Sequence, residues 1–455
     1  MVLLSEFVQL KRADNALTSV RAGRVCRGLW LQRWLVICLT VLSMLAQIDK
    51  YILTLLVGSI KRDLVLTDTE IGLAIGVAFG VANAVVGVPA GWFADRISRR
   101  GIIAGAVALW SVLAAACGFA NSFWQLFFTR VGVGFGEGIL PPACYSLIRD
   151  GVDPERRGRA FSAFAVAGSA GAGLSLLLGG ALIGAIVASG VQALPLIGPV
   201  KPWQIALIVI GIAGVPLALI AYAFADPGRD RAEHDKVTTF SETFHRLYPH
   251  RVPMLLLSGF SVANAMLTAS IGAWLPAYLE RGFGLTPQAI GPTLGILLML
   301  AAPTGLALAG QSIDLASKRG PEGPALVAIV ASCILVFTAI LVPIVPSLPV
   351  LWGLQTLLVF CSVVYLPVTS TIVARLMPSG AIGKTMSLFL LAQGVCGAGV
   401  APVIVALISA HLFPAQTNSL GYALTTVSAI YGAIATACAI GLYFALRRYK
   451  QANVS

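Results

Sequence analysis

The sequence predicts an all-α integral membrane protein with twelve transmembrane helices in two six-helix bundles. Of its 455 residues, 58% are hydrophobic and only 11% are charged, and the mean hydropathy is +0.88. The apolar runs exceed the roughly 20 residues that a helix needs to cross a bilayer core of about 30 Å, and backbone groups in lipid must be paired internally. A charged, glycine-bounded turn also occurs twice, at matching places in the two halves of the chain. Such repetition is typical of a duplicated membrane protein.

The predicted spans follow one another with short connections. They cover residues 34–60, 70–94, 101–120, 124–149, 158–188, 202–225, 252–280, 287–313, 323–345, 349–376, 382–411 and 420–446. The longest polar stretch falls at the middle of the chain and separates six spans from six. We therefore predict an N-terminal segment (1–30), an N-terminal bundle (31–225), a central loop (226–250), a C-terminal bundle (251–446) and a tail (447–455).

The distribution of basic residues predicts that both termini and the central loop are cytoplasmic. Of the 31 Lys and Arg residues, 25 lie in the N-terminal segment, in the loops after even-numbered spans or in the tail. Only Lys61, Arg62, Lys201 and Arg281 lie in the opposite loops, a clear inside excess. The net charge of +12 thus indicates topology and attraction to anionic lipid, not nucleic-acid binding. Short loops favour a bacterial inner membrane, and the basic residues of segment 1–30 suit a short surface helix on it.

The repeated turn is the strongest sign of paired halves. Its first copy runs from Ala90 to Gly101, and the second runs from Ala309 to Gly320. In both copies Ala, Gly, Asp, Ser, a basic pair and a closing Gly recur in register. The charged residues of the two copies are Asp95, Arg96, Arg99 and Arg100 in the first, and Asp314, Lys318 and Arg319 in the second.

Four charged residues lie inside predicted spans and away from the span ends, Asp49 and Lys50 on the first and Arg130 and Glu137 on the fourth. Such residues are costly, at roughly 2.5–3.5 kcal/mol for Asp, Lys or Arg at a helix centre, and therefore face water or one another. Seven residues make two helical turns, so Arg130 and Glu137 share a face about 10 Å apart in depth. We expect Asp49 to lie between them in depth and to join them in a cluster. Lys50 is turned by about 100° from Asp49 and can face elsewhere.

Two interpretations of this cluster stay open. The ion pairs can be purely structural. Alternatively, desolvation disfavours a charged carboxylate while a nearby cation favours it, and this balance poises Asp49 and Glu137 to exchange protons, with Arg130 and Lys50 orienting them or binding an anionic solute. The corresponding spans of the second half carry no interior charge. Gln355 occupies the position that matches Arg130, and Ser362 the position that matches Glu137.

The chain resembles the major facilitator superfamily from about residue 31 to residue 446. The turn after Gly91 is similar to the family's signature Gly-x-x-x-Asp-Arg-x-x-Arg-Arg. The resemblance implies a cytoplasmic latch in which Asp95 accepts bonds from a helix end and from a basic residue of the neighbouring bundle. The other members of the implied latch are Gly91, Arg96, Arg99, Arg100, Asp314 and Arg319.

Within that superfamily, several short motifs resemble the spinster-like branch, which includes transporters of lysolipids and sphingolipid-like molecules. They are Asp49-Lys50, Arg130 with Gly134-Phe135-Gly136-Glu137-Gly138, Pro142-Ala143 and Ser146-Leu147-Ile148-Arg149-Asp150. The branch usually has Asp-Arg in place of Asp49-Lys50, and Lys lacks the bidentate fork of Arg. The neighbouring branch of organic-anion and sugar-acid importers shares much of this pattern.

The resemblance also implies that the first, fourth, seventh and tenth spans surround the substrate path. The candidate cavity residues on these spans are Tyr51, Tyr145, Asn264, Thr268, Gln355, Ser362 and Tyr365. Tyr and Trp also gather at membrane interfaces, and Trp274 and Tyr278, near a helix end, are assigned there. A cavity with cations on one wall and apolar groups on the other suits an organic or amphipathic anion.

The sequence therefore predicts a monomeric secondary active transporter that moves a small organic, anionic or lipid-like solute by alternating access, coupled to protons. The alternatives are an uncoupled uniporter and a transporter-derived receptor or scaffold. The expected partners are the solute, protons and membrane lipid, with no nucleic acid. No cofactor or metal is expected, because the eight cysteines lack metal-ligand spacing. No nucleophile–base pair indicates an enzyme, and no phosphate-binding loop indicates an ATP-driven pump.

Overall fold

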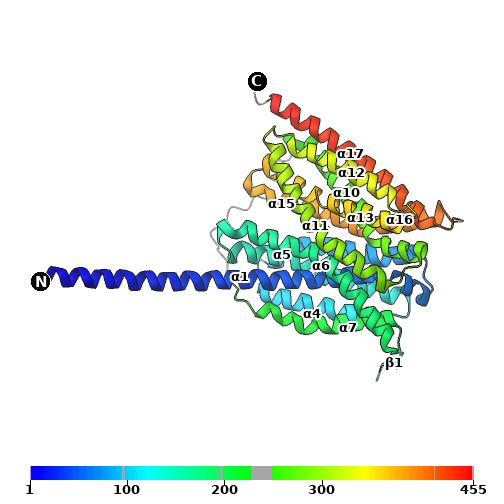
Figure 1. Ribbon diagram of the computed structural model, residues 1–455, viewed down its shortest axis with the longest axis horizontal. Coiled ribbons are helices and arrows are strands. Elements are labelled where there is room, and N and C mark those ends of the chain that lie inside the picture. Colours follow the sequence, from blue (N-terminus) through cyan, green and yellow to red (C-terminus); the bar gives the residue numbers. More distant parts are fainter. Residues whose placement is uncertain are drawn as a thin grey trace.

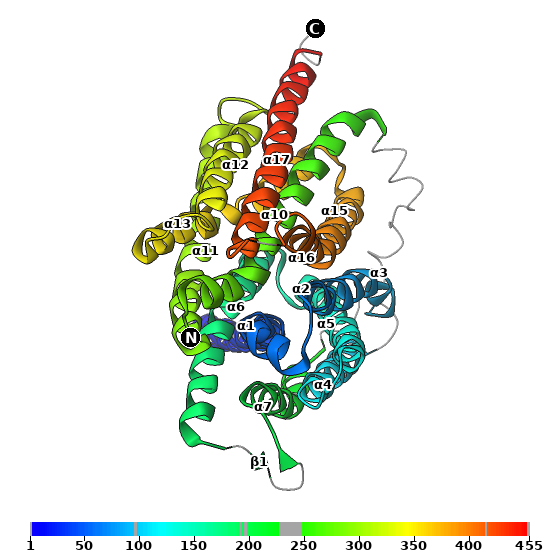
Figure 2. The ribbon, with the colours of Figure 1, turned by 90° about the vertical axis from the view of Figure 1, so that its right-hand side faces the viewer.

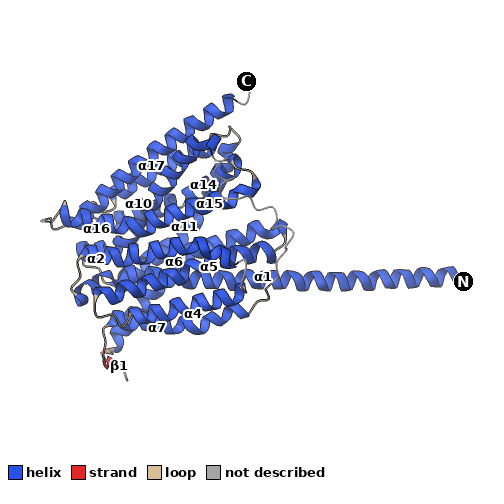
Figure 3. Cartoon of the chain, turned by 180° about the vertical axis from the view of Figure 1, so that it is seen from behind, coloured by secondary structure: helices blue, strands red, loops and turns tan. Residues whose placement is uncertain are grey.

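The computed structural model describes the backbone of residues 2–94, 98–191, 193–194, 198–226, 248–414 and 416–452. It describes the side chains of these ranges from residue 28 to residue 448, except at residues 88, 91–94, 154, 194, 379 and 380. Within these ranges twelve helical segments are long and apolar enough to cross a membrane. The predicted number of spans is therefore confirmed, and Figure 3 shows that helices make up almost all of the chain.

The N-terminal half contains the first six spans. Its elements are α1 (Val2–Leu64), α2 (Asp68–Gly72), η1 (Leu73–Val81), α3 (Ala82–Ala94), α4 (Arg99–Cys117), α5 (Phe123–Gly151), α6 (Pro154–Ser189), α7 (Pro202–Leu217) and η2 (Ala218–Tyr222). The segments α2, η1 and α3 form one span, whose middle part η1 is a π-helix. Two short strands, β1 (Ala193–Leu194) and β2 (Gly198–Pro199), pair as a hairpin between α6 and α7.

The C-terminal half contains the other six spans. Its elements are η3 (Tyr248–His250), α10 (Arg251–Phe283), α11 (Pro287–Ser317), α12 (Gly323–Leu341), α13 (Leu348–Ser362), α14 (Tyr365–Leu376), α15 (Ser379–Gln393), η4 (Gly394–Val400), α16 (Ala401–His411) and α17 (Ser419–Ala452). Here too a π-helix, η4, interrupts one span, between α15 and α16. Most of the predicted central loop, residues 227–247, lies outside the described residues.

Local sequence sets the helix boundaries at the short connections. Thr67 and Glu70 form a capping box at the start of α2, where the Thr67 hydroxyl accepts from the Glu70 amide and the Glu70 carboxylate accepts from the Thr67 amide. Ser122 caps α5 in a similar way through the Gln125 amide. Gly190 and Gly284 end α6 and α10 in the left-handed conformation, with φ of 64° and 65°.

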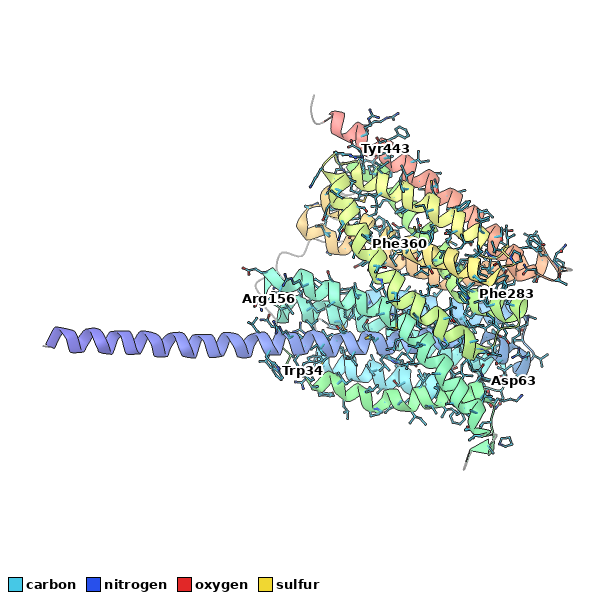
Figure 4. All side chains as sticks on the ribbon, viewed as in Figure 1. Trp34, Asp63, Arg156, Phe283, Phe360 and Tyr443 are labelled. Atoms are coloured by element: carbon cyan, nitrogen blue, oxygen red, sulfur yellow. The ribbon has the colours of Figure 1, made fainter. Side chains whose placement is uncertain are left out.

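The two halves pack side by side as separate groups of helices (Figures 1 and 2). They touch through α1 and α10, through α6 and α11, and through α2 and η1 against η4 and α16. We call the end of the bundle from which α1 projects the proximal end, and the opposite end the distal end. In Figure 1 the halves lie close together at the distal end and diverge towards the proximal end. Figure 4 places Trp34 and Arg156 proximally and Asp63 and Phe283 distally.

Small residues allow the close approach between the halves. A side chain at Gly76 or Gly80 of η1 would meet the backbone of Ala398 or Gly399 in η4. Gly291 and Gly295 of α11 are likewise seated against the backbone of α6. Little hydrophobic driving force acts between helices in lipid, so their association depends on close van der Waals contacts. Small residues permit these contacts because they let the backbones approach each other.

Apolar side chains cover much of the outer surface of the bundle. Leu255, Leu300 and Phe337 are 70%, 64% and 62% exposed. A soluble protein would not expose so many large apolar groups together, whereas lipid solvates them. This surface agrees with the predicted membrane setting.

The N-terminal segment differs from the expected surface helix. The helix α1 runs without a break from Val2 to Leu64, so that residues 2–27 continue the first span straight beyond the proximal end (Figure 1). Between Val2 and the first predicted span the sequence contains no Pro and only two Gly residues, so nothing in this segment strongly opposes a continuous helix.

Candidate functional site

The structure brings the intramembrane charges together in the N-terminal half. Asp49 on α1 and Arg130 and Glu137 on α5 are buried, with 4%, 3% and 5% of their surfaces exposed. Asp49, Arg130 and Lys50 all interact electrostatically with Glu137. Lys50 therefore belongs to the same group of charges. Its position about 100° around α1 from Asp49 would also have allowed it to face away from them. We call these four residues the charge cluster.

Glycines of α5 place Glu137 deep among the helices. A side chain at Gly134 would overlap the backbone of Phe79 in η1, and one at Gly138 would overlap the backbone of Asn83 in α3. Gly136, on another face of α5, lies against Trp110 and the Ala106 carbonyl of α4. The motif Gly-Phe-Gly-Glu-Gly thus lets three helices approach one another closely around the carboxylate.

Aromatic rings surround the two cations of the cluster. The Arg130 guanidinium lies over the Phe79 ring, 4.6 Å from its centroid. The Lys50 ammonium lies 5.9 Å from the centroid of the same ring and 5.5 Å from that of Tyr51. The fully buried indole of Trp110 interacts with Asp49, although its N–H makes no hydrogen bond of standard geometry. The sequence did not predict the roles of Phe79 and Trp110. Apolar spans contain many aromatic residues, and nothing in the sequence shows which of them contacts a charged group.

Within the described residues the cluster contains no close ion pair. No cation lies within 4.0 Å of the Asp49 or Glu137 carboxylate, and the buried atoms Arg130 Nε and Glu137 Oε1 have no hydrogen-bond partner. Buried polar groups normally have partners. Groups held near one another but not fully paired can bind a proton, water or a polar solute without first breaking a tight ion pair.

The candidate cavity residues are only partly brought together. Tyr51 on α1 and Tyr365 on α14 interact electrostatically across the boundary between the halves. Tyr145 is 42% exposed, and its ring lies 5.6 Å and 5.4 Å from those of Phe161 and Phe164 on α6.

The other polar candidates lie on the C-terminal half and bond mostly to their own helices. The Asn264 amide, the Thr268 hydroxyl and the Ser362 hydroxyl donate to carbonyls one turn earlier in the same helix, as is common for such residues within helices. Gln355 is buried, and its Oε1 has no hydrogen-bond partner. Its amide is therefore the strongest candidate on this half for contact with a polar ligand.

The assignment of Trp274 and Tyr278 to the membrane interface is wrong. Both side chains are buried, at 0% and 4% exposure. The Trp274 indole donates to the Pro402 carbonyl of α16, and the Tyr278 hydroxyl donates to the Pro343 carbonyl. Their position near a helix end suggested contact with lipid headgroups, but both tie α10 to neighbouring segments of its own half.

The first copy of the repeated turn lies at the proximal end. Gly91 is on α3, which contacts α15 of the other half, whereas Asp95 and Arg96 lie outside the described residues. Arg99 is buried and forms ion pairs with Asp150 at the end of α5 and with Asp226 after η2, at 2.5 and 2.6 Å. Arg100 donates to the Tyr222 carbonyl at 3.0 Å. These two arginines therefore bind within the N-terminal half, and the latch role of the turn stays a prediction.

The second copy of the turn is less buried. Asp314 and Arg319 are exposed at the end of α11 and just after it. A cation from α14, Arg375, donates to the Ser317 hydroxyl of this turn at 2.6 Å.

Ion pairs join the two halves at the distal end. Arg281 at the end of α10 donates to both oxygens of Asp68 at the start of α2, at 2.7 and 2.9 Å. Arg62 of α1 pairs with Glu280 of α10 at 2.5 Å. Lys61 shares Asp68, at 2.6 Å. We call these five residues the distal clasp. The sequence shows that these five residues are charged, but it does not show which carboxylate each basic side chain pairs with.

Comparison with known proteins agrees with this architecture. The family model of the Major Facilitator Superfamily matches residues 39–402. The chain belongs to the major facilitator superfamily.

Relatives place this transporter in the spinster-like branch of the superfamily. The chain is 24% identical to an MFS-type efflux pump of Mycolicibacterium smegmatis over 415 residues, which are 91% of this chain and 92% of the pump. It is 24% identical to protein spinster of Drosophila melanogaster over 68% of this chain and 49% of that protein, so it spans about half the length of the insect relative. The resemblance inferred from the motifs is thus confirmed.

A solved structure shows the same fold. It is a bacterial homolog of the human lysosomal transporter Spinster in an inward-facing and unoccupied conformation. The match has a TM-score of 0.77 and 21% sequence identity, and it covers 92% of this chain and 98% of that one. The protein is therefore an integral membrane transporter of the spinster type, and its family comprises transporters, not enzymes.

Proposed function

We propose that this transporter carries an organic anion, or an amphipathic molecule with an anionic group, together with protons. The observation that carries the proposal is the charge cluster, which holds two carboxylates and two cations inside membrane-spanning helices. Buried intramembrane charges are expensive and mark ion or substrate pathways. The arrangement of all four in one half, beside the boundary with a less charged half, suits a coupling site.

The charges of the cluster explain how protons and an anion would bind together. With both carboxylates ionised, Asp49 and Glu137 balance Lys50 and Arg130. Protonation of the carboxylates removes that balance and leaves the two cations to bind an anionic group. Because each ligand favours the binding of the other by the same factor, proton and anion are carried together.

We also propose that the central site opens alternately to the two ends by rocking of the halves. The distal clasp and the proximal divergence of the helices support a conformation that is closed distally. The excess of basic residues at the proximal end supports a cytoplasmic location for that end, with both termini inside. We further propose that the protein acts as a monomer in a bacterial inner membrane.

The Arg281→Ala substitution is expected to shift the protein towards distally open conformations. Partly exposed ion pairs are worth about 0.2–1 kcal/mol each, so the ratio of open to closed protein should rise by up to about fivefold. The distance between spin labels at Val65→Cys and Thr286→Cys can be measured by electron–electron resonance in a background without other cysteines. In Arg281→Ala, a larger fraction of molecules should show the long distance than in the protein with Arg281. The Arg281→Lys variant, which keeps the charge beside Asp68, should retain more of the short distance, and an unchanged distribution in Arg281→Ala would contradict the clasp.

Transport under an imposed pH gradient tests the coupling. The solute is first found by comparing metabolite and lipid extracts of cells with and without the gene. The labelled solute is then offered to proteoliposomes that contain the purified protein. We expect acid outside to drive accumulation and reversal of the gradient to drive efflux. Equal transport with and without the gradient would instead indicate an uncoupled uniporter.

A further inference from the structure

One aromatic ring contacts both cations of the charge cluster. The Phe79 ring lies 4.6 Å from the Arg130 guanidinium carbon and 5.9 Å from the Lys50 ammonium, measured to the ring centroid. Phe79 is only 3% exposed. A cation over a desolvated aromatic face is attracted more strongly than one at an exposed ring. The ring is thus a partner for the buried Arg130 guanidinium on α5 and for the partly buried Lys50 ammonium on α1.

The backbone around Phe79 fixes the position of the ring. Phe79 belongs to the π-helix η1, and its backbone lies against Gly134, one turn beyond Arg130 on α5. The next residue, Gly80, lies against the backbone of η4 in the other half. The π-helix η1 covers nine residues, and π-helical geometry inside a longer helix often occurs at functional sites. Phe79 therefore lies between the charge cluster on one side and the contact between the halves on the other.

We infer that Phe79 is a positioning residue that holds Arg130 and Lys50 away from direct ion pairs with Asp49 and Glu137. The inference rests on the proposed proton coupling. Within the described residues neither cation lies within 4.0 Å of these carboxylates, although all four groups interact electrostatically. Without the aromatic face, the best remaining partner for a buried guanidinium is a carboxylate. A tight ion pair of that kind would oppose protonation of the carboxylate.

Besides the four residues of the charge cluster, three titratable residues lie around it. Cys117 of α4 interacts with Asp49 and Arg130, Tyr51 of α1 lies beside the Lys50 ammonium, and Tyr365 of α14 interacts with Tyr51. None of them lies on η1. A change at Phe79 therefore acts on the carboxylates through the cations and not by adding or removing a charge.

Infrared titration of the full-length protein in liposomes tests the inference without a known solute. The carboxyl stretch of buried acids is followed against pH, and the Asp49→Asn and Glu137→Gln variants identify the bands. In Phe79→Leu we expect these bands to titrate about one pH unit lower, a tenfold loss of proton affinity, which is within the range of a desolvated cation–π contact. Phe79→Tyr, which keeps the ring, should titrate like the unsubstituted protein.

Further variants separate positioning from packing. Trifluorophenylalanine at position 79 keeps the shape of the ring but weakens its negative face, so it should shift the bands in the same direction even if Phe79→Leu fails to fold. Phe260→Leu removes a buried ring in the other half and should leave the bands in place. Bands that stay unshifted with the fluorinated ring would overturn the positioning role. If no band is lost in either Asp49→Asn or Glu137→Gln, the proposed proton coupling itself fails.

Discussion

The Asp49→Asn and Glu137→Gln substitutions are each expected to abolish proton-driven accumulation of the solute while leaving its exchange across the membrane. Asn and Gln are close in shape to the carboxylates but cannot carry a proton between the two sides. For one proton per solute, a gradient of one pH unit supplies about 1.4 kcal/mol and sustains about a tenfold concentration ratio. In the variants this ratio should fall to about one. Labelled solute in proteoliposomes measures it.

A carboxylate outside the cluster provides the matched control for this loss. Asp63 lies at the distal end, where it binds Lys201 and Trp203. The Asp63→Asn variant removes one carboxylate charge and should retain the response to the gradient. If Asp49→Asn and Glu137→Gln keep full accumulation, the two buried acids have a structural role only.

The Arg99→Ala substitution is expected to have the largest effect on stability. Arg99 is 1% exposed and binds two carboxylates, one at the end of α5 and one after η2. Removing one partner from a buried ion pair typically costs about 3–5 kcal/mol. We expect a clearly lower midpoint of thermal unfolding for the purified protein in detergent. Arg99→Lys keeps the charge but not the planar fork that reaches both acids, so its midpoint should be intermediate.

Arg149 is the matched control for Arg99. It binds the same Asp150 carboxylate at 3.0 Å, but its side chain is 45% exposed. Exposed ion pairs contribute about 0–1 kcal/mol, so Arg149→Ala should lower the unfolding midpoint only slightly. Equal losses in Arg99→Ala and Arg149→Ala would show that burial of Arg99 does not add to its stabilising effect.

Much of the fold could be predicted because a lipid bilayer restricts the secondary structures that a chain can adopt within it. Apolar runs must form helices there, and the number of spans follows from their length. The grouping of Asp49, Arg130 and Glu137 could also be predicted, because helical periodicity sets their faces and the cost of burial leaves them few alternatives. Both predictions depend on strong local constraints.

The parts that could not be predicted depend on packing between distant segments. Phe79 has no sequence feature that distinguishes it from other apolar aromatic residues, and its contact with Arg130 requires the close approach of η1 at Gly134. The partners of Arg99 lie 51 and 127 residues away along the chain. Trp274 was misplaced for the same reason, because its burial depends on the α16 backbone that its indole binds.

Counting protons that move with the solute is the most direct test of the central claim. A pH electrode in a weakly buffered suspension of proteoliposomes records the protons taken up when solute is added. The claim predicts alkalinisation outside in step with solute entry for the unsubstituted protein, and none for Asp49→Asn combined with Glu137→Gln. Solute entry without any proton movement in the unsubstituted protein, or the same movement in the double variant, would contradict it.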